Sequence, residues 1–362
     1  YTHGTFKNGK KYTEMVTGIF PASLNDQTIK FNLIIQFPDN NENQDSEKGK
    51  TFNGKVVVNY DNSIATYLAK LDKTENGLEE DKTTDKNLRY VGASPRNYLK
   101  FNGDEIWRIV GVFNNITTID ENGKEKKESL VKIVRNDSLG NYSWDSSDSS
   151  KNSGLGINEW SQADLMTELN TDYINQNPTS TTTLWFNGKN NAQNGTYDYS
   201  KNIKSSWVDK VAKVRWNLGG YNTSSVSALN MYNAERGTAH ISNPSDGTTR
   251  KNTWDGKIAL IYPSDYGYAS TNTTCRGNLG STDSNNNVYC KNENWLFNSA
   301  YQWTLSPYSG VADIVFLVLS GGRVYYYNAS GPRGVRPALF LKSNVVIAGG
   351  TGESVENAYT LE

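Results

Sequence analysis

The chain has 362 residues, enough for one large domain with a smaller one, or for two or three domains. Its 37 basic and 38 acidic residues nearly balance, so bulk charge gives no reason to expect binding to nucleic acid or to an anionic membrane. Only 36% of the residues are hydrophobic, but 22 tyrosines and 9 tryptophans supply large side chains for a core and argue against a disordered chain.

The N-terminal segment is predicted to be rich in β-structure. Three strands are expected there, at Tyr12–Phe20, Thr28–Phe37 and Lys55–Tyr60. A helix should follow, capped by Asn62 or Ser63 and ending at Leu71, because apolar side chains then repeat on one face.

Charged residues from 72 to 86 predict the main domain boundary. Residues 1–85 are expected to be a β-rich N-terminal region and linker on the anchoring or stalk side, and residues 86–362 a larger domain. No apolar run is long enough to span a membrane, and no signal peptide is recognisable. Because the sequence begins at Tyr1, an export or anchor segment is expected to precede it, and this fragment is not expected to insert into a membrane.

The larger domain is predicted to be an α+β fold. Its first strands are expected at Arg89–Val91, Tyr98–Phe101, Ile106–Phe113 and Ser129–Arg135. The residues Ser161–Asp164 match a capping box that opens one helix, and a second helix is expected from Ser206 toward Trp216. A compact apolar strand, Ile258–Tyr262, precedes the last group of strands. Strands and helices do not alternate, which excludes a parallel β/α architecture.

The cysteines Cys275 and Cys290 lie in a polar segment without neighbouring histidines or further cysteines, so they are poor metal ligands. A disulfide that closes this loop is the favoured prediction, and two reduced thiols are the alternative. A disulfide would indicate an oxidising compartment, so we expect an extracellular or cell-surface protein.

A β-hairpin is predicted near the C-terminus, where Ile314–Leu319 and Arg323–Tyr327 flank Ser320–Gly322. Alternation puts Phe316, Val318, Val324 and Tyr326 on one face. The opposite, outward face would carry Leu317, Leu319, Arg323, Tyr325 and Tyr327. An outward face is usually polar, so this composition indicates a contact surface. Burial of both faces would explain the pattern equally well.

Catalytic groups are scarce. His3 and His240 are the only histidines and are far apart in the sequence, so a catalytic triad is not favoured. Asp145–Asp148 and Asp283–Asn287 could supply oxygen ligands to calcium, but neither has EF-hand spacing, and ordinary solvated loops are favoured. The sequence therefore predicts no catalytic residue, no metal and no cofactor.

Several motifs resemble the C-type-lectin-fold variable proteins that diversity-generating retroelements target in gut bacteria and their phages. The resemblance covers about Asn87 to Glu362 and rests mainly on Trp303–Pro307, Val315–Val318, Ser320–Gly322 and Gly334–Leu339. Similar elements occur at Asn87–Gly92, Ile106–Val112, Ser138–Tyr142, Ile258–Asp265 and Gly349–Gly352. It implies a C-type-lectin-like fold of antiparallel sheets plus two helices, preceded by the small β-rich N-terminal region, and a variable region at about 303–341.

In this family, adenine-directed mutagenesis of Asn-type codons changes side chains on a fixed backbone. Such codons cannot yield Lys, Glu, Gln, Met or Trp, and residues 311–333 contain none of these. The resemblance implies a framework of Trp303, Leu305, Pro307, Val315, Phe316, Val318, Ser320, Gly322, Val324, Ala329 and Gly334–Leu339. It implies these ligand-binding positions: Tyr308, Val311, Ala312, Asp313, Ile314, Leu317, Leu319, Arg323, Tyr325, Tyr326, Tyr327, Asn328, Ser330, Pro332 and Arg333.

The predicted function is therefore non-enzymatic: adhesion to a protein or glycan ligand on another cell or surface, through the C-terminal hairpin and loop. A phage receptor-binding tail protein on a virion surface is the alternative binding role. A structural pilus or tail subunit, whose C-terminal face packs against other subunits, is a further alternative. An enzyme of the formylglycine-generating, sulfatase-modifying type shares the fold, but it would need Cys275 and Cys290 as reactive thiols.

Overall fold

The computed structural model describes residues 63–146, 154–175, 185–189, 197–239 and 248–362. All of them belong to a unit that extends from residue 62 to residue 362. The strands expected at Tyr12–Phe20, Thr28–Phe37 and Lys55–Tyr60 lie outside the described residues.

The described helices are short. They are α1 (Ile64–Ala69), α2 (Lys73–Asn76), α3 (Asp164–Asn170), α4 (Ser205–Val208), α5 (Ala228–Glu235), α6 (Pro263–Tyr268), α7 (Thr273–Gly277) and α8 (Ser284–Asn292). Single 3₁₀ turns occur at Trp160–Gln162 and Tyr199–Lys201. None of the described helices is long and apolar enough to cross a membrane.

Sixteen strands accompany these helices. They are β1 (Leu78–Glu80), β2 (Leu88–Tyr90), β3 (Tyr98–Lys100), β4 (Ile106–Ile119), β5 (Glu125–Arg135), β6 (Asn141–Tyr142), β7 (Val214–Asn217), β8 (Thr253–Gly256), β9 (Ile258–Ala259), β10 (Gln302–Pro307), β11 (Ile314–Val318), β12 (Val324–Asn328), β13 (Arg333–Gly334), β14 (Ala338–Phe340), β15 (Ile347–Gly349) and β16 (Thr360–Leu361). The expected α+β class is confirmed, with more helices than the two that were expected.

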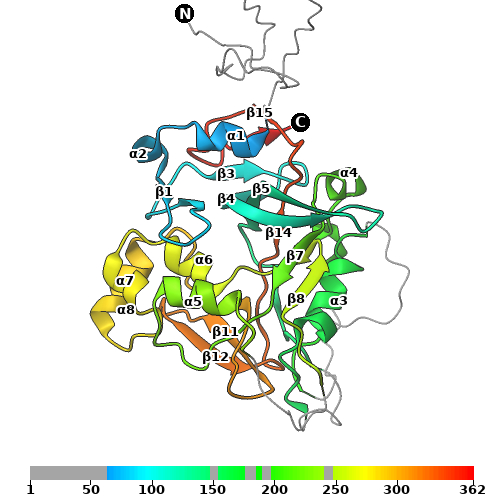
Figure 1. The fold of residues 1–362 in the computed structure, drawn as a ribbon, viewed down its shortest axis with the longest axis vertical. Helices are drawn as coiled ribbons and strands as arrows, with labels where there is room; N and C mark the ends of the chain where they lie inside the picture. The colour runs from blue at the N-terminus through cyan, green and yellow to red at the C-terminus, as the bar shows by residue number, and fades with distance from the viewer. Residues whose placement is uncertain (1–62, 147–153, 176–184, 190–196, 240–247) are drawn as a thin grey trace, which may run out of the picture. The chain divides into compact units, whose positions relative to one another are not determined.

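The main sheet has nine strands in the order β1-β2-β4-β5-β14-β9, with β3 and β7 on β4 and with β8 on β7. Its pairs are antiparallel. The long hairpin of β4 and β5 is its centre (Figure 1). The inner halves of both strands are buried. The uncharged outer half of β4 and the charged outer half of β5 meet at a turn, where Asp120 accepts hydrogen bonds from Asn122 N and Lys124 N.

The second sheet has the order β12-β11-β10-β13-β6, with one parallel pair, β10 and β13. β12 is one of its two edge strands, and β6 is the other. In Figure 1, β11 and β12 lie at the opposite end of the unit from α1 and β15. Ser63 bridges Val346 beside β15, so the chain enters the described unit at the end far from β12.

One hydrophobic core extends through both sheets. Its largest side chains are tryptophans that are less than 2% exposed: Trp107, Trp144, Trp160, Trp185, Trp216 and Trp303. Aromatic residues bury a large area each, which explains how a chain with few aliphatic residues forms a core. The motif from Gly334 to Leu339 links the two sheets, because β13 lies in the second and β14 pairs with β5 in the first.

The described structure departs from three sequence expectations. The boundary expected after residue 85 falls inside the unit, because α1 packs on β4 and β5, and β1 pairs with β2. The capping box at Ser161–Asp164 is wrong: Ala163 precedes α3 without a side-chain cap, while Glu159 caps a 3₁₀ turn. The helix expected from Ser206 stops at Val208, and Val214–Asn217 forms β7 instead, because it pairs with β8.

Candidate binding surface

The predicted hairpin is present as β11 and β12. Leu319 N donates to Arg323 O at 2.9 Å, and Gly322, with φ of +91°, allows the tight turn between the strands. The register pairs Phe316 with Tyr326 and Val318 with Val324, as the alternation predicts.

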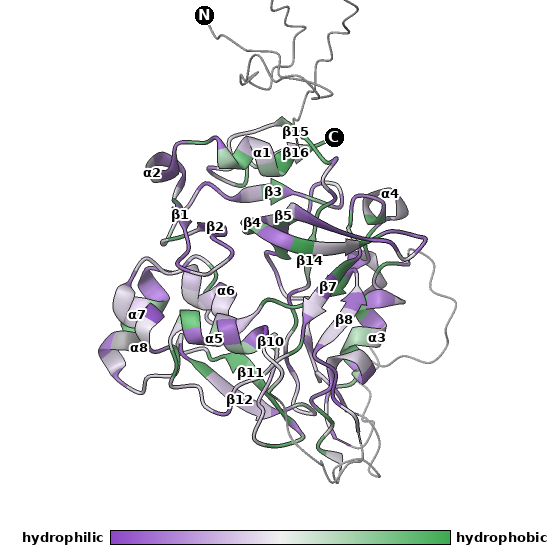
Figure 2. Ribbon diagram, viewed as in Figure 1, coloured by the Kyte–Doolittle hydropathy of each residue, from purple (hydrophilic) through white to green (hydrophobic). Residues whose placement is uncertain are grey.

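Only one of the two hairpin strands is accessible. Every residue from Val315 to Val318 is buried, and β11 is strongly hydrophobic along its length (Figure 2). The outward position expected for Leu317 is therefore wrong, because this side chain is fully buried between Trp303 of β10 and Tyr325 of β12 in the sheet register. On β12, Tyr325 and Tyr326 are half-buried and Tyr327 is 40% exposed. Burial of both faces thus holds for β11 and not for β12.

The tyrosines near β12 form a continuous chain of rings. The ring centres of Tyr308 and Tyr326 are 4.5 Å apart. The Tyr326 ring stacks on the Tyr325 ring, with 4.5 Å between the ring centres and an angle of 12° between the ring planes. The centre of the Tyr327 ring lies 6.1 Å from the centre of the Tyr325 ring and 6.5 Å from that of the Tyr301 ring. Four ring contacts thus link Tyr301, Tyr308 and the three tyrosines of β12 into one group.

Two arginines border these rings. The Arg323 guanidinium lies 4.8 Å from the centre of the Tyr325 ring. Arg333 lies 4.7 Å from the Tyr327 ring and 5.3 Å from the Tyr301 ring, and its Nη1 donates to Pro332 O at 2.7 Å. We call Tyr301, Tyr308, Tyr325, Tyr326, Tyr327, Arg323 and Arg333 the tyrosine–arginine surface.

The hydroxyl of Tyr326 remains protonated near neutral pH. Partial burial raises the pKa of Tyr326, and the neighbouring Tyr325 and Tyr308 raise it further. This hydroxyl can therefore both donate and accept a hydrogen bond.

Three other predicted ligand-binding positions lie in the interior, contrary to expectation. Ala312 is 5% exposed, and its carbonyl accepts hydrogen bonds from Asn158 N and Arg250 Nη2. Asp313 is 8% exposed and accepts from Asn328 Nδ2, and Ser330 is 1% exposed. These residues fasten the loops beside β12 and cannot contact a ligand in this conformation. Among the remaining predicted positions Val311 is exposed, and four are partly exposed: Ile314, Leu319, Asn328 and Pro332.

A buried amide holds the loop from Tyr308 to Ile314. Asn158 Nδ2 lies 2.9 Å from Tyr308 O, 2.8 Å from Val311 O and 3.0 Å from Ile314 O. Arg250 Nε donates to Asn158 Oδ1 at 3.1 Å, which orients the amide so that its nitrogen faces the loop. The position of Tyr308 is thus set by residues far away in the sequence.

The strand that precedes the hairpin is fixed by tryptophans. Trp303 Nε1 donates to Tyr142 O at 3.0 Å, and Trp144 Nε1 donates to Thr304 O at 3.1 Å. Gly334 is needed because a Cβ there would lie 2.7 Å from Tyr301 O. The sequence did not assign Tyr301 to the surface, although its place just before the framework motif at Trp303 was a usable signal.

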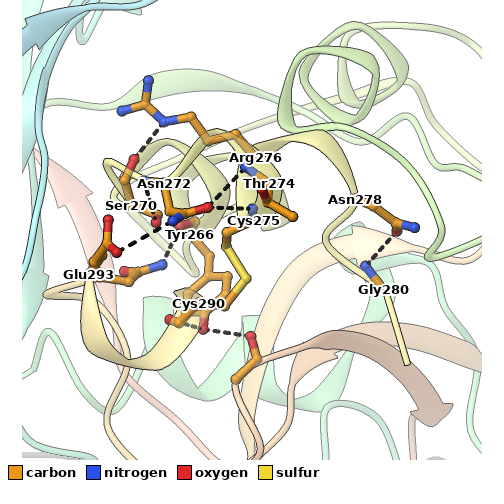
Figure 3. The surroundings of a disulfide bond; sticks show 12 residues. Tyr266, Ser270, Asn272, Thr274, Cys275, Arg276, Asn278, Gly280, Cys290 and Glu293 are labelled. Atoms are coloured by element: carbon orange, nitrogen blue, oxygen red, sulfur yellow. Dashed lines mark hydrogen bonds between the residues drawn. A yellow bond between two sulfur atoms is a disulfide. The ribbon is translucent and has the colours of Figure 1, made fainter. Parts of the chain in front are cut away.

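The disulfide between Cys275 and Cys290 is present and supports the hairpin turn (Figure 3). The Tyr266 hydroxyl lies 2.7 Å from Gly322 O and 3.1 Å from Cys290 O, so it connects the turn to α8. Leu279 O, just after α7, accepts from Val324 N at 2.8 Å. The region expected to be a loop is therefore two short helices, capped by side chains of Asn272 and Asp283.

A cluster of charged side chains away from this surface is buried from solvent. Asp265 bonds Arg89 Nη1 at 2.6 Å and Lys132 Nζ at 2.5 Å, and Arg89 Nε bonds Asp81 at 2.9 Å, with no side chain more than 2% exposed. Burial raises the pKa of Asp265, but Lys132 and Arg89 lower it to about 2. The cluster joins β2, β5 and α6 and is not a candidate site. Single charges inside apolar strands, as at Arg89 and Lys132, were its sequence signal.

The described aspartates of the Asp/Asn-rich segments accept hydrogen bonds from backbone amides, and residues 147 and 148 lie outside the described part of the chain. Asp145 accepts from Ile157 N and Asp164 N, and Asp283 accepts from Asn285 N. Within the described ranges, no group of three or more His, Cys, Asp or Glu side chains is arranged to hold a metal ion.

Comparison with known proteins gives no match among protein-family models, curated proteins or solved structures.

Proposed function

We propose that this chain is a non-enzymatic binding protein and that the tyrosine–arginine surface is its recognition site for a protein or glycan on another cell or surface. The observation that carries the proposal is the contrast between neighbouring strands. β11 is buried on both faces, whereas β12 presents a chain of tyrosine rings at the outer edge of the sheet.

The side chains of this surface suit recognition. Tyrosine and arginine supply much of the binding energy at protein interfaces, because large and rigid groups lose little conformational entropy on binding. Here the rings already touch one another, and the Asn158 amide and the Tyr266 hydroxyl fasten the adjoining loop and turn. A pre-organised surface loses less free energy when it is ordered in a complex.

We also propose the C-type-lectin-like fold and diversification of this surface. The antiparallel sheets and the glycine at Gly334 support the family resemblance. The expected framework positions Trp303, Phe316 and Val324 are fully buried, while most expected variable positions are accessible. A reverse-transcriptase gene near a partial copy of the 303–341 coding region, differing at adenines, would support diversification. Without them, the binding proposal stands without this mechanism.

The disulfide bears on the alternatives. A disulfide and the lack of a membrane-spanning helix among the described residues are compatible with a secreted or extracellular protein. Cys275 and Cys290 are joined, so they are not free thiols for chemistry of the formylglycine-generating type. A phage tail protein or a pilus-associated adhesin would use the same surface, and we propose a bacterial cell surface or, alternatively, a virion as its place.

The test replaces Tyr325 and Tyr327 together with alanine. Fluorescent tetramers of the chain are applied to a panel of bacterial cells and to a glycan array. We expect wild-type binding to at least one target and a loss of about tenfold or more in the double variant, since both rings are central to the surface.

Tyr289→Ala is the matched control. Tyr289 and Tyr327 are both 40% exposed. Asn287 and Lys291 lie on the side of α8 that faces the hairpin turn at Gly322, whereas Tyr289 projects from the opposite side of this helix. Equal binding by the wild type and a correctly folded double variant would refute the proposed site.

A further inference from the structure

The arginines of the tyrosine–arginine surface differ from the other accessible arginines in the described ranges. The other accessible arginines of these ranges are four in number, and each lies within 4 Å of a carboxylate. The pairs are Arg96 with Glu75, Arg215 with Asp255, Arg236 with Asp85 and Arg276 with Glu79. Among the described residues, no carboxylate lies within this distance of Arg323 or Arg333. The side chain of Asp313 is buried, and its carboxylate accepts a hydrogen bond from Asn328 Nδ2.

Arg333 is held in place without being neutralised. Its guanidinium lies against the rings of Tyr301 and Tyr327, and it donates one hydrogen bond to a neutral carbonyl, Pro332 O. Its Nε is buried and has no acceptor among the residues that the structure describes. Ring faces attract a cation but carry no net charge. A carboxylate supplied from outside would therefore find a fixed, unpaired partner, and charge-assisted bonds of this kind are the strong ones.

The two cations flank the rings. Arg323 precedes β12 at the turn, and Arg333 lies beside Tyr327 near the other end of the strand. Arg323 and Tyr327 are four residue steps apart along the strand, which corresponds to about 13 Å. Lys291 adds a third cation beside the turn, because its stem passes Gly322.

The backbone of β12 favours a polypeptide partner. The Leu319–Arg323 hydrogen bond and the register of the two strands direct the backbone groups of Arg323, Tyr325 and Tyr327 toward β11. The backbone groups of Val324 and Tyr326 therefore face the free edge. Val324 N already donates to Leu279 O. No backbone partner of Tyr326 occurs in the described part of the chain. An extended peptide can add to such an edge, which a glycan cannot do.

We infer that the partner of the tyrosine–arginine surface is a protein that presents an acidic segment, whose carboxylates pair with Arg323 and Arg333. The inference rests on the proposed function and adds the chemical class of the partner. Charge complementarity at the edges of an interface mainly sets specificity and association rate, while the tyrosines supply the contact area.

The test selects a random peptide library on the whole chain and removes clones that also bind the Tyr325→Ala, Tyr327→Ala variant. We expect the remaining peptides to be rich in Asp and Glu. Their affinity should fall about tenfold for Arg333→Gln, with a smaller loss for Arg323→Gln, and both losses should shrink at about 0.5 M salt. Arg215→Gln is the control, because this accessible arginine lies on β7 and is paired with Asp255.

The outcomes separate the inference from the proposed function. Peptides that need the tyrosines but are neutral or basic, and bind the two glutamine variants normally, would overturn the acidic partner and leave the site standing. A library without any tyrosine-dependent peptide would count against both. Sulfated and sialylated glycans are tested in parallel, and arginine-dependent binding there without acidic peptides would overturn the assignment to a protein. Circular dichroism verifies that each variant is folded. If Arg333→Gln does not fold, the affinity of the selected peptides for Arg323→Gln decides the test.

Discussion

Replacing Glu235 with glutamine should remove a pH dependence from the stability of the fold. Glu235 ends α5 and is fully buried, where its carboxylate accepts hydrogen bonds from Ser264 N at 2.9 Å and from Ser264 Oγ at 2.5 Å. Burial raises the pKa of Glu235 to about 7, although Arg236 and Ser264 act in the opposite direction. Glutamine keeps the shape and can still accept from Ser264 N, but it cannot ionise.

The sign follows from the two protonation states. In the unfolded chain this carboxyl loses its proton near its ordinary pKa of 4.5, whereas in the folded protein it keeps the proton up to about pH 7. Between these values the folded state holds a proton that the unfolded state has released, so the free energy of unfolding falls as the pH rises. The fall amounts to about 3 kcal/mol across this window. Asp265 acts in the opposite direction, but only between about pH 2 and its ordinary 3.8.

Urea unfolding between about pH 5 and pH 8 measures the effect. The wild-type free energy of unfolding, minus that of Glu235→Gln, should decrease by about 3 kcal/mol from acid to alkaline pH. Taking the difference cancels the titration of other groups. Glu121→Gln removes an exposed carboxylate, and its profile should run parallel to the wild type. Parallel profiles for Glu235→Gln as well would refute the reasoning, because they would mean that Glu235 has the same charge in the folded and unfolded chain throughout.

Two further predictions concern the support of the surface. Asn158→Ala should lower the free energy of unfolding by about 1–3 kcal/mol, since the carbonyls of the Tyr308–Ile314 loop lose their buried donor; urea unfolding with no measurable change would contradict this. Joint replacement of Cys275 and Cys290 by serine should lower it by about 3 kcal/mol, because their disulfide closes a segment with a sequence separation of 15. A variant as stable as the oxidised wild type would show that the disulfide does not constrain the unfolded chain.

Local patterns predicted the elements that local forces determine. Ser63 caps α1 as expected, because its hydroxyl can reach Thr66 N within the same turn. The alternation in β11 and β12 gave the correct register for the hairpin. The prediction for the segment near Trp216 was wrong, because its strand forms by pairing with β8 and β4, and no local pattern can specify these partners.

The candidate surface was predictable in composition and only partly in position. Alternation correctly separates the two faces of a strand, but it cannot say what covers each face. Leu317 is buried because β10 places Trp303 beside it, and Ala312 is buried because Asn158 and Arg250 reach it across long sequence distances. Tyr301 joins the surface through its contact with Tyr327, which requires the folded sheet.

The edge position of β12 decides which side chains a diversified surface can change. Truncating a fully buried leucine such as Leu317 typically costs about 2–5 kcal/mol, a large part of the stability of a domain. Changing an accessible side chain such as Tyr327 usually alters stability by less than about 0.5 kcal/mol. If the resemblance to retroelement-diversified proteins is correct, natural variation must therefore concentrate on β12 and the accessible loop positions. Leu317, Ala312 and Asp313 should stay constant even if their codons are targets, because most of their variants would unfold before they could be selected for binding.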